Sequence, residues 1–203
     1  MSRLLDIATR NAHRLGELVG DLLLLQSADV GKFSLDLGNV DLAEVVNTAA
    51  HSFQPYASRF GVAVKIDVTT ENPIVRGDRK RLDQVVVNLL SNAAKFSQAG
   101  GTISVGLGRD GENLVISVAD QGIGIPEGSE SVIFEEVGQL DSSDQRKFQG
   151  TGLGLSISKR IVDAHSGSIA YTSKLGYGTT FNVSLKAADA ADGTKPQSYS
   201  DAA

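Results

Sequence analysis

The sequence predicts an α+β fold, in which one compact domain follows a long N-terminal helix. Along the sequence, segments with the helical spacing of apolar residues are followed by segments in which apolar and polar residues alternate, as in strands. Glycine-containing turns separate these segments. A chain of 203 residues with 41% hydrophobic content suits one core with appendages. We expect a helix over residues 1–30, a linker over 31–40, a compact domain over 41–187 and a disordered tail over 188–203.

The N-terminal segment is expected to form one amphipathic helix. Its residues at alternating steps of four and three form the seam of a helix that packs on others. The seam contains Leu4, Ala8, Asn11, Leu15, Leu18, Leu22 and Leu25. Leu5, Ala12 and Val19 widen it on one side, which favours a helical bundle over a two-stranded coil. Such a seam can join two copies of the chain in a homodimer.

Within the compact domain, local signals predict helices and strands in turn. Asp41 and Asp78 can each cap a helix, because aspartate accepts hydrogen bonds from the first backbone N–H groups of a helix. The expected helices cover about 41–59, 78–96 and 152–165, and the expected strands cover about 62–68, 102–107, 113–119, 168–173 and 179–185. The stretch 121–151 is too long for an ordinary connector, so we expect it to be functional or mobile.

The composition excludes several classes of protein. A formal net charge of -5 and a pI of about 5.2 disfavour nucleic acid as a partner. The chain has no cysteine, which excludes disulfides and thiolate metal sites. The longest leucine run, Leu22 to Leu25, is far shorter than the roughly 20 apolar residues of a membrane-spanning helix. The charged residues near the N-terminus exclude a signal peptide. We therefore expect no membrane segment in this chain and a cytoplasmic location.

The helix expected over about 78–96 carries a polar face that suits a chemical role. At 100° per residue, five polar side chains fall within about 80° of arc, and the leucines and valines lie on another face. These side chains are Arg81, Gln84, Asn88, Asn92 and Lys95. The amide oxygens of Asn88 and Asn92 can bind a hard cation such as Mg²⁺, and Lys95 can lie near substrate phosphates. The alternative is a solvated polar face that happens to hold two asparagines.

A second motif, Asp120 to Gly124, follows an expected strand. The carboxylate of Asp120 can accept a hydrogen bond from an exocyclic amino group. Gly122 and Gly124 let the backbone approach a planar base closely or take a positive φ. The alternative is an ordinary turn at the end of a strand, where aspartate and glycine are common.

A third motif, Gly150 to Leu155, opens the helix expected over about 152–165. Backbone N–H groups at a helix N-terminus bind anionic phosphate, and glycines allow close contact. The motif is not a Walker A box, because no Gly-Lys-Ser/Thr follows, and a long loop rather than a strand precedes it, which argues against a dinucleotide-binding fingerprint. The alternative is a flexible hinge at the start of a helix.

Three further residues near these motifs are candidates. Arg146 and Lys147 precede the third motif and, in a mobile lid, can reach a γ-phosphate; the alternative is a solvated basic pair. Thr179 begins an expected strand, and its hydroxyl can bond the base or belong to ordinary strand sequence. Together with the motifs, these residues predict a nucleotide site with a flexible lid.

In their order and spacing, the motifs resemble those of the catalytic, ATP-binding domain of sensor histidine kinases, within the GHKL ATPase superfamily. Asn88 to Lys95 is similar to the N box of that family, Asp120 to Gly124 to its first glycine box, Phe134 to its F box and Gly150 to Gly154 to its second glycine box. The resemblance covers about residues 39–186 and extends weakly into the N-terminal helix, which looks like the second helix of the dimerisation hairpin. It implies a two-layer α/β sandwich, with a mixed sheet covered by helices on one face.

The resemblance also implies a role for each matching residue. Asn92 would be the protein ligand of Mg²⁺, Asn88 would order the waters and phosphates around the metal, and Asp120 would bind the adenine amino group. The catalytic residues would be Asn88 and Lys95. The ATP-binding residues would be Asn88, Asn92, Lys95, Asp120, Gly122, Gly124, Ile125, Arg146, Lys147, Gly150, Thr151, Gly152, Leu153, Gly154, Leu155 and Thr179.

The function implied by the resemblance is an ATP-binding catalytic module that transfers the γ-phosphoryl group of ATP to a histidine. ATP and Mg²⁺ would be its cofactors, and a histidine-bearing dimerisation domain and a response regulator would be its protein partners. Two alternatives remain open: an ATP-binding and dimerisation module without transfer, and a GHKL ATP hydrolase. Asn88 argues against the hydrolase, because related hydrolases carry a glutamate base at that position.

None of the three histidines has the sequence context of the family's phosphoacceptor, which an acidic residue and an Arg-Thr-Pro run typically follow. His13 is followed by Arg14, His51 lies inside the compact domain, and His165 lies at an expected helix end. No convincing phosphoacceptor histidine is therefore expected in this sequence. We expect the acceptor on another polypeptide, or on a part of the protein that precedes this sequence.

Overall fold

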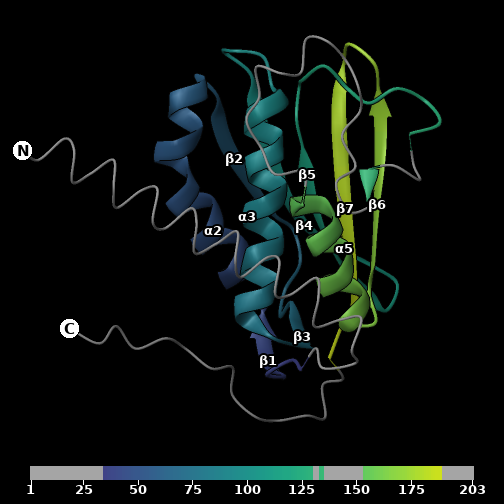
Figure 1. Ribbon diagram of the computed structural model, residues 1–203. Helices are drawn as coiled ribbons and strands as arrows, with labels where there is room; N and C mark the ends of the chain where they lie inside the picture. The colour runs from purple at the N-terminus through teal and green to yellow at the C-terminus, as the bar shows by residue number, and fades with distance from the viewer. Residues whose placement is uncertain (1–33, 130–132, 135–152, 189–203) are drawn as a thin grey trace, which may run out of the picture.

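The computed structural model describes residues 34–129, 133–134 and 153–188 of the chain. In these residues, a layer of three α-helices covers one face of a five-stranded sheet (Figure 1). The elements in chain order are β1 (Gly38–Asp41), α2 (Leu42–Ala57), η1 (Ser58–Phe60), β2 (Ala63–Val68), β3 (Ile74–Gly77), α3 (Arg79–Phe96), β4 (Thr102–Asp110), β5 (Asn113–Ala119), α5 (Gly154–Ala164), β6 (Ser168–Lys174) and β7 (Gly178–Lys186). The expected N-terminal helix, most of the 121–151 stretch and the tail from residue 189 lie outside the described residues.

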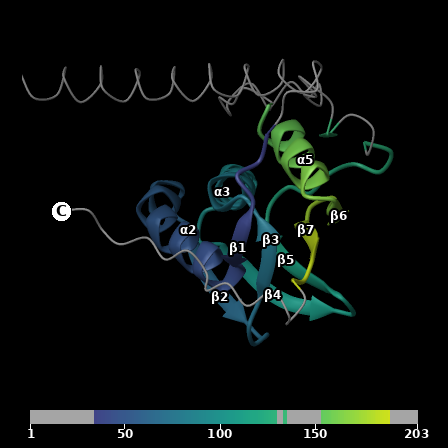
Figure 2. The same cartoon turned by 90° about the horizontal axis from the view of Figure 1, so that it is seen from below.

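The large sheet is mixed, as the resemblance implied. Its strand order is β2-β4-β5-β7-β6, with β2 parallel to β4 and the other neighbours antiparallel. A two-residue turn joins β4 to β5 after the pair Asp110 and Asn113, and Gly111 in this turn has a φ of 58°, which glycine adopts without strain. Seen along the sheet in Figure 2, α2, α3 and α5 lie side by side on the same face. The predicted two-layer sandwich is therefore confirmed.

The two predicted aspartate caps are present. Asp41 Oδ1 accepts hydrogen bonds from the backbone N–H groups of Ala43 at 2.8 Å and Glu44 at 3.3 Å, at the start of α2. Asp78 Oδ1 accepts from Arg81 N at 3.2 Å, at the start of α3. These contacts satisfy donors that a helix start leaves without an intrahelical partner. The helices therefore begin where the sequence predicted them to begin.

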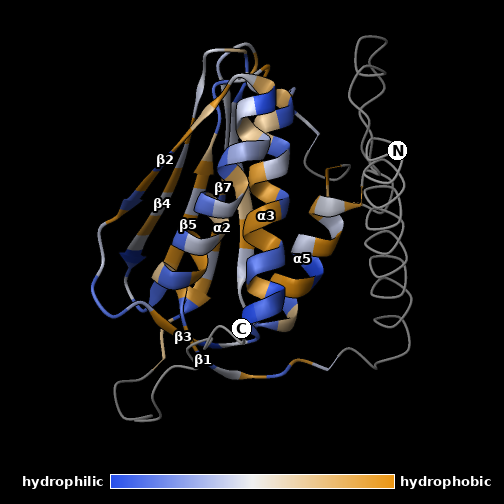
Figure 3. Cartoon of the chain, turned by 90° about the vertical axis from the view of Figure 1, so that its left-hand side faces the viewer, coloured by the Kyte–Doolittle hydropathy of each residue, from blue (hydrophilic) through white to orange (hydrophobic). Residues whose placement is uncertain are grey.

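One hydrophobic core fills the space between the two layers. Every second residue of β5, and of β4 as far as Leu107, is buried, as expected for strands with one face on a core. The buried side of α3 carries leucines and valines, and Figure 3 shows hydrophobic and hydrophilic residues alternating around this helix. The largest fully buried side chains include Leu82, Leu89, Leu90, Ile103, Leu107, Leu114, Ile116, Ile157 and Ile161. No helix among residues 34–129, 133–134 and 153–188 combines the length and the apolar character needed to cross a membrane.

A small second sheet was missed by the sequence reading. Residues 38–41, expected to belong to a linker over 31–40 and the start of a helix, form strand β1. β1 pairs antiparallel with β3, which was not expected either. Each strand has four residues and contains a glycine, so local propensity is weak, and it is the pairing between distant segments that forms the strands.

His165 connects α5 to the start of α3. Its Nε2 accepts a hydrogen bond from the backbone N–H of Asp78 at 2.9 Å, and its Nδ1 lies 2.7 Å from the carbonyl oxygen of Ile161. Nε2 must be unprotonated to accept, and Nδ1 must carry the proton to donate, so both contacts require the neutral ring with its proton on Nδ1. The ring therefore satisfies a backbone donor of Asp78, a residue that is only 8% exposed.

We expect His165→Phe to lower the free energy of unfolding by about 1–3 kcal/mol, because it leaves the Asp78 N–H buried without its acceptor. Urea unfolding of the variant and of the wild type measures this difference. His51→Phe is the matched control, because His51 is exposed and its hydrogen bond among the described residues joins Nδ1 to Asn47 O of its own helix. Equal losses in the two variants would contradict the assigned role of His165.

Candidate nucleotide site

The polar face of α3 faces away from the core, as the helical periodicity predicted. Asn88, Asn92 and Lys95 are all partly exposed, while Leu89 and Leu90 between them are fully buried. The ammonium of Lys95 lies 5.5 Å from the centre of the Phe96 ring, a cation–π distance. α3 therefore presents two amides and one ammonium together, on a helix whose opposite side is fixed by packing.

Asn88 connects this face to the second glycine box. Its Nδ2 lies 3.2 Å from the carbonyl oxygen of Gly154 and 3.4 Å from Ser158 Oγ, both in α5. These contacts bring the N-box motif and the end of the second glycine motif together across 66 residues of sequence. Ser158 was not singled out from the sequence, because a serine inside an expected helix carries no local signal of such a contact.

The start of α5 differs from the starts of α2 and α3. Aspartates cap α2 and α3, whereas α5 follows Leu153, which makes no side-chain cap hydrogen bond. The first turn of α5 contains no acidic residue. An uncapped helix start attracts an anion through its backbone N–H groups and its dipole. The geometry of residues 153–155 is therefore compatible with phosphate as the cap.

Asp120 lies at the end of β5 and is held by its neighbours. Its Oδ1 accepts from the backbone N–H of Gly122 at 2.9 Å and of Thr179 at 3.3 Å. Its own N–H donates to Thr179 O at 2.8 Å. Burial raises the pKa of the Asp120 carboxyl above its ordinary value, and the two backbone hydrogen bonds oppose this shift. Since both donors reach Oδ1, Oδ2 is the oxygen left, within the described part of the chain, to accept from a ligand.

Two glycines of the first glycine box are required by close backbone contacts. A Cβ at Gly122 would lie 2.2 Å from Phe96 O, and a Cβ at Gly124 would lie 2.3 Å from Lys174 O. Gly124 also has a φ of 69°, which strains any other residue. The segment is joined to the end of α3 by the hydrogen bond from Ile123 N to Phe96 O at 3.3 Å. α3 therefore contacts both glycine boxes, the second through the Asn88 side chain and the first through the Phe96 carbonyl at its last residue.

The remaining residues of the first box rest on β6 and β7. Ile125 N donates to Ser173 Oγ at 2.7 Å, and Ser173 Oγ lies 2.9 Å from Thr179 Oγ1. Ser173 Oγ also donates to Gly178 O at 3.0 Å, so the Thr179 hydroxyl directs its proton to Ser173 and can accept from another group. Ser173 is a second residue that the sequence reading missed, since its role depends on contacts between strands.

Several predicted residues cannot be compared with the structure. Five of them lie outside the described residues, namely Arg146, Lys147, Gly150, Thr151 and Gly152. Of the expected F box, Phe134 is described, and its ring lies 6.2 Å from the Tyr171 ring and 6.5 Å from the Phe181 ring, centre to centre. Phe134 therefore packs on the strands β6 and β7.

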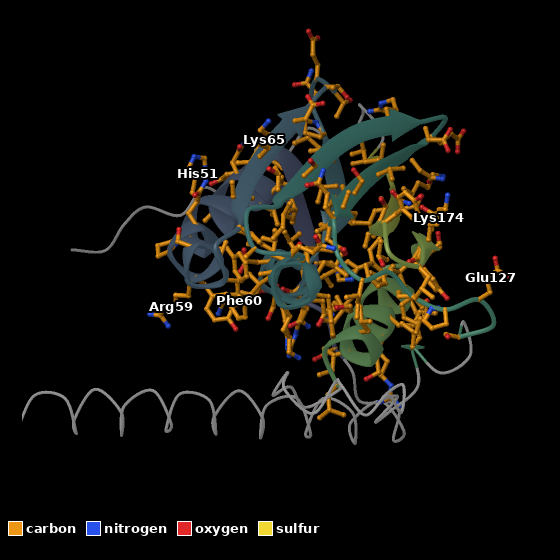
Figure 4. All side chains as sticks on the ribbon, turned by 90° about the horizontal axis from the view of Figure 1, so that it is seen from above. His51, Arg59, Phe60, Lys65, Glu127 and Lys174 are labelled. Carbon is orange, nitrogen blue, oxygen red and sulfur yellow. The ribbon has the colours of Figure 1, made fainter. Side chains whose placement is uncertain are left out.

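The described hydrogen bonds of the two described histidines do not involve Asn88, Asn92 or the start of α5. His51 is exposed on α2, and Figure 4 shows it at the opposite edge of the molecule from Lys174. His165 follows the last residue of the 11-residue helix α5, so about 16 Å of helix separates it from Gly154. His13 lies outside the described residues. That the sequence holds no convincing phosphoacceptor histidine stays a prediction.

Comparison with known proteins gives the same family as the motifs. The model of the histidine kinase-, DNA gyrase B- and HSP90-like ATPases matches residues 77–189. The circadian input-output histidine kinase CikA of Synechococcus elongatus is 37% identical over 169 residues, which cover 82% of this chain and 22% of that protein. The sensor-like histidine kinase SenX3 of Mycolicibacterium smegmatis is 32% identical over 190 residues, which cover 94% of this chain and 48% of that protein.

A solved structure agrees with these relatives. Full-length ShkA in complex with AMPPNP has a TM-score of 0.68 and 30% identity, covering 85% of this chain and 38% of that one. The chain spans less than half the length of the curated relatives named above. The family match covers more than half of the chain and includes α3, Asp120 and α5. The chain therefore belongs to the family of histidine kinase-, DNA gyrase B- and HSP90-like ATPases, as an ATP-binding domain of the sensor histidine kinase type.

Proposed function

We propose that this chain is the catalytic module of a two-component sensor kinase and that it transfers the γ-phosphoryl group of ATP to a histidine on a separate domain. The single observation that carries the proposal is the meeting of two motifs, through the contact of Asn88 Nδ2 with Gly154 O at 3.2 Å. In the transfer, the bond between the γ-phosphorus and the bridging oxygen breaks, a bond to a histidine nitrogen forms, and ADP leaves. The acceptor histidine, the response regulator and the cytoplasmic location are parts of the same proposal.

The residues divide between the two ends of the nucleotide. Asp120 Oδ2 accepts a hydrogen bond from the adenine amino group, and Gly122, Gly124 and Ile125 contact the base. Thr179 supports that end, because its N–H donates to Asp120 Oδ1 and its hydroxyl contacts Ser173, which accepts from Ile125 N. At the other end, the start of α5 binds phosphate oxygens through backbone N–H groups. Arg146 and Lys147 are proposed to close over the phosphates.

The amides of α3 suit a metal with hard oxygen ligands. The Nδ2 of Asn88 contacts Gly154 O, so its Oδ1 is the atom directed to another partner. Asn92 follows one turn later on the same partly exposed face, and we propose its amide oxygen as the protein ligand of Mg²⁺. Bound Mg²⁺ would neutralise phosphate charge during transfer. Asn88 and Lys95 would orient the phosphates and the waters around them.

Phosphoryl transfer in trans tests the proposal. The full chain is incubated with γ-labelled ATP, Mg²⁺ and the histidine-bearing dimerisation domains of several sensor kinases, and acid-labile label on those domains is measured. Label is expected with Mg²⁺ and is expected to disappear with a chelator. Asn92→Ala is expected to remove the effect of Mg²⁺ on ATP affinity, because it removes the proposed protein ligand.

The outcome separates the candidate functions. ATP binding without label on any acceptor domain would support a non-catalytic ATP-binding and dimerisation module. Steady release of inorganic phosphate that depends on Asn88 would support an ATP hydrolase. The absence of any ATP binding by the folded chain would overturn all three.

A further inference from the structure

The amide group of Asn88 has only one orientation that agrees with its surroundings. One of its two terminal atoms lies 3.2 Å from Gly154 O, and a carbonyl oxygen can only accept. The atom at this position must therefore be Nδ2, because Oδ1 would place two acceptors against each other. The identity of the two amide atoms thus follows from the hydrogen-bond network.

Ser158 adds a second acceptor for the same amide. Its Oγ donates to Gly154 O at 2.8 Å, so the hydroxyl proton is directed at that carbonyl. The lone pairs of Oγ are then left to accept, and Asn88 Nδ2 lies 3.4 Å away. Ser158 is 0% exposed, so water does not compete for these contacts. The Asn88 amide therefore faces two acceptors of α5, the carbonyl of its first residue and the hydroxyl one turn later.

We propose that Ser158 is a positioning residue for nucleotide binding, which holds the Asn88 amide with Oδ1 directed toward the metal and its waters. This inference rests on the proposed function, since it needs Asn88 to act at the phosphate end of the site. An alanine at 158 leaves Asn88 with one acceptor in place of two. The amide then samples more orientations, and its oxygen is presented to the metal-bound phosphates for less of the time.

The contact also makes the orientation of Asn88 depend on α5. Gly154, whose carbonyl oxygen accepts from both Ser158 and Asn88, is the first residue of that helix. The same first turn is the proposed phosphate cradle. A bound phosphate that orders this turn therefore also orders the Asn88 amide, which links phosphate binding to the metal side of the site.

Ser156 provides a matched control within the same helix. It is also buried, at 3% exposed, and its Oγ also donates to a carbonyl of the helix start, Leu153 O, at 2.9 Å. Ser156 thus shares the burial and the backbone hydrogen bond of Ser158, and the described contacts of its hydroxyl do not include Asn88. Alanine at either position removes a similar local contact, and only the change at 158 affects the amide.

The test measures the affinity of the full chain for AMPPNP by calorimetry, once with Mg²⁺ and once with EDTA. The readout is the ratio of the two dissociation constants, because a general loss of structure changes both equally. Ser158→Ala is expected to lower the Mg²⁺-dependent gain in affinity about three- to tenfold, the effect of one neutral hydrogen bond, with the EDTA value unchanged. Ser156→Ala is expected to leave the ratio unchanged. In an Asn88→Ala background, Ser158→Ala is expected to have no further effect.

A wild-type ratio in Ser158→Ala, or an equal loss in Mg²⁺ and EDTA, would overturn the role of Ser158 and leave the proposed function intact. A further loss on adding Ser158→Ala to Asn88→Ala would also overturn it, because the serine would then act without the amide. A wild-type chain with no Mg²⁺-dependent binding of AMPPNP would overturn the proposed function, and this inference with it.

Discussion

Asp120→Asn is expected to weaken ATP binding by about 1–3 kcal/mol, because it removes a charge-assisted hydrogen bond to the adenine amino group. The asparagine oxygen can still accept from Gly122 N and Thr179 N, since both donors reach Oδ1. The atom changed is then the one at the position of Oδ2, where an amide NH₂ would meet the adenine NH₂ as donor against donor. Calorimetry with ATP measures the loss, and wild-type affinity in the variant would contradict the adenine assignment.

The same substitution is expected to leave the nucleotide-free protein at least as stable as the wild type at pH 7. Burial raises the pKa of Asp120 in the folded protein above the ordinary value of 3.8, so the folded state binds the proton more tightly than the unfolded chain does. Stability from this group is therefore fully present below pH 3.8 and is lost as the pH rises through the raised pKa. At pH 7 the wild type carries a half-buried charge that the amide lacks.

Thermal unfolding without nucleotide checks the sign of this effect. The melting temperature of the Asp120→Asn variant relative to the wild type is expected to be highest near pH 7 and to fall toward pH 3.8, as more of the wild-type carboxyl in the folded protein takes up its proton. A variant that is less stable than the wild type at pH 7 would contradict burial as the cause of the raised pKa. Weaker binding together with equal or greater stability is the pattern of a residue kept for ligand binding.

Local sequence signals predicted the helices and most of the strands, because each of these elements carries its own pattern. In α3, a capping aspartate, a buried apolar side and a polar face all follow from spacing along one helix. The same spacing identified Asn88 and Asn92 as neighbours on one face. β1 and β3 were missed, because each has only four residues and the pair forms through contacts between residues 33 to 39 positions apart, from Asp41 with Ile74 to Gly38 with Gly77.

The candidate site was predictable as a set of residues and not as a set of contacts. Asp120 and the glycines were identified from their types and spacing. The hydrogen bonds of Ser158 to Asn88 and of Ser173 to Ile125 join segments far apart in sequence, and serine in a helix or strand is too common to indicate them. The sequence alone indicated a glycine at 122 for close backbone approach, and it could not indicate which atom makes the glycine necessary. The backbone atom that excludes a side chain there belongs to another element.

Gly122→Ala is expected to destabilise the domain by about 1–3 kcal/mol and to abolish measurable ATP binding. A Cβ at this position would lie 2.2 Å from Phe96 O and 2.7 Å from Asp120 Oδ1, distances that real Cβ atoms do not adopt. The chain can relieve the first contact only by moving away from α3, which breaks the hydrogen bond from Ile123 N to Phe96 O. It can relieve the second only by turning the Asp120 carboxylate, whose Oδ1 accepts from Gly122 N.

Gly108→Ala is the matched control, because it makes the same chemical change in β4 with the nearest contact, Thr69 Oγ1, at an ordinary 3.5 Å. It is expected to change stability by no more than about 0.5 kcal/mol and to leave ATP affinity unaltered. Urea unfolding and calorimetry on both variants separate two causes of lost binding. If Gly122→Ala folds with wild-type stability and still loses ATP, the carboxylate has turned while the contact with α3 has held. Normal ATP binding by Gly122→Ala would show that a methyl group fits at position 122. It would contradict the close contact between this segment and α3.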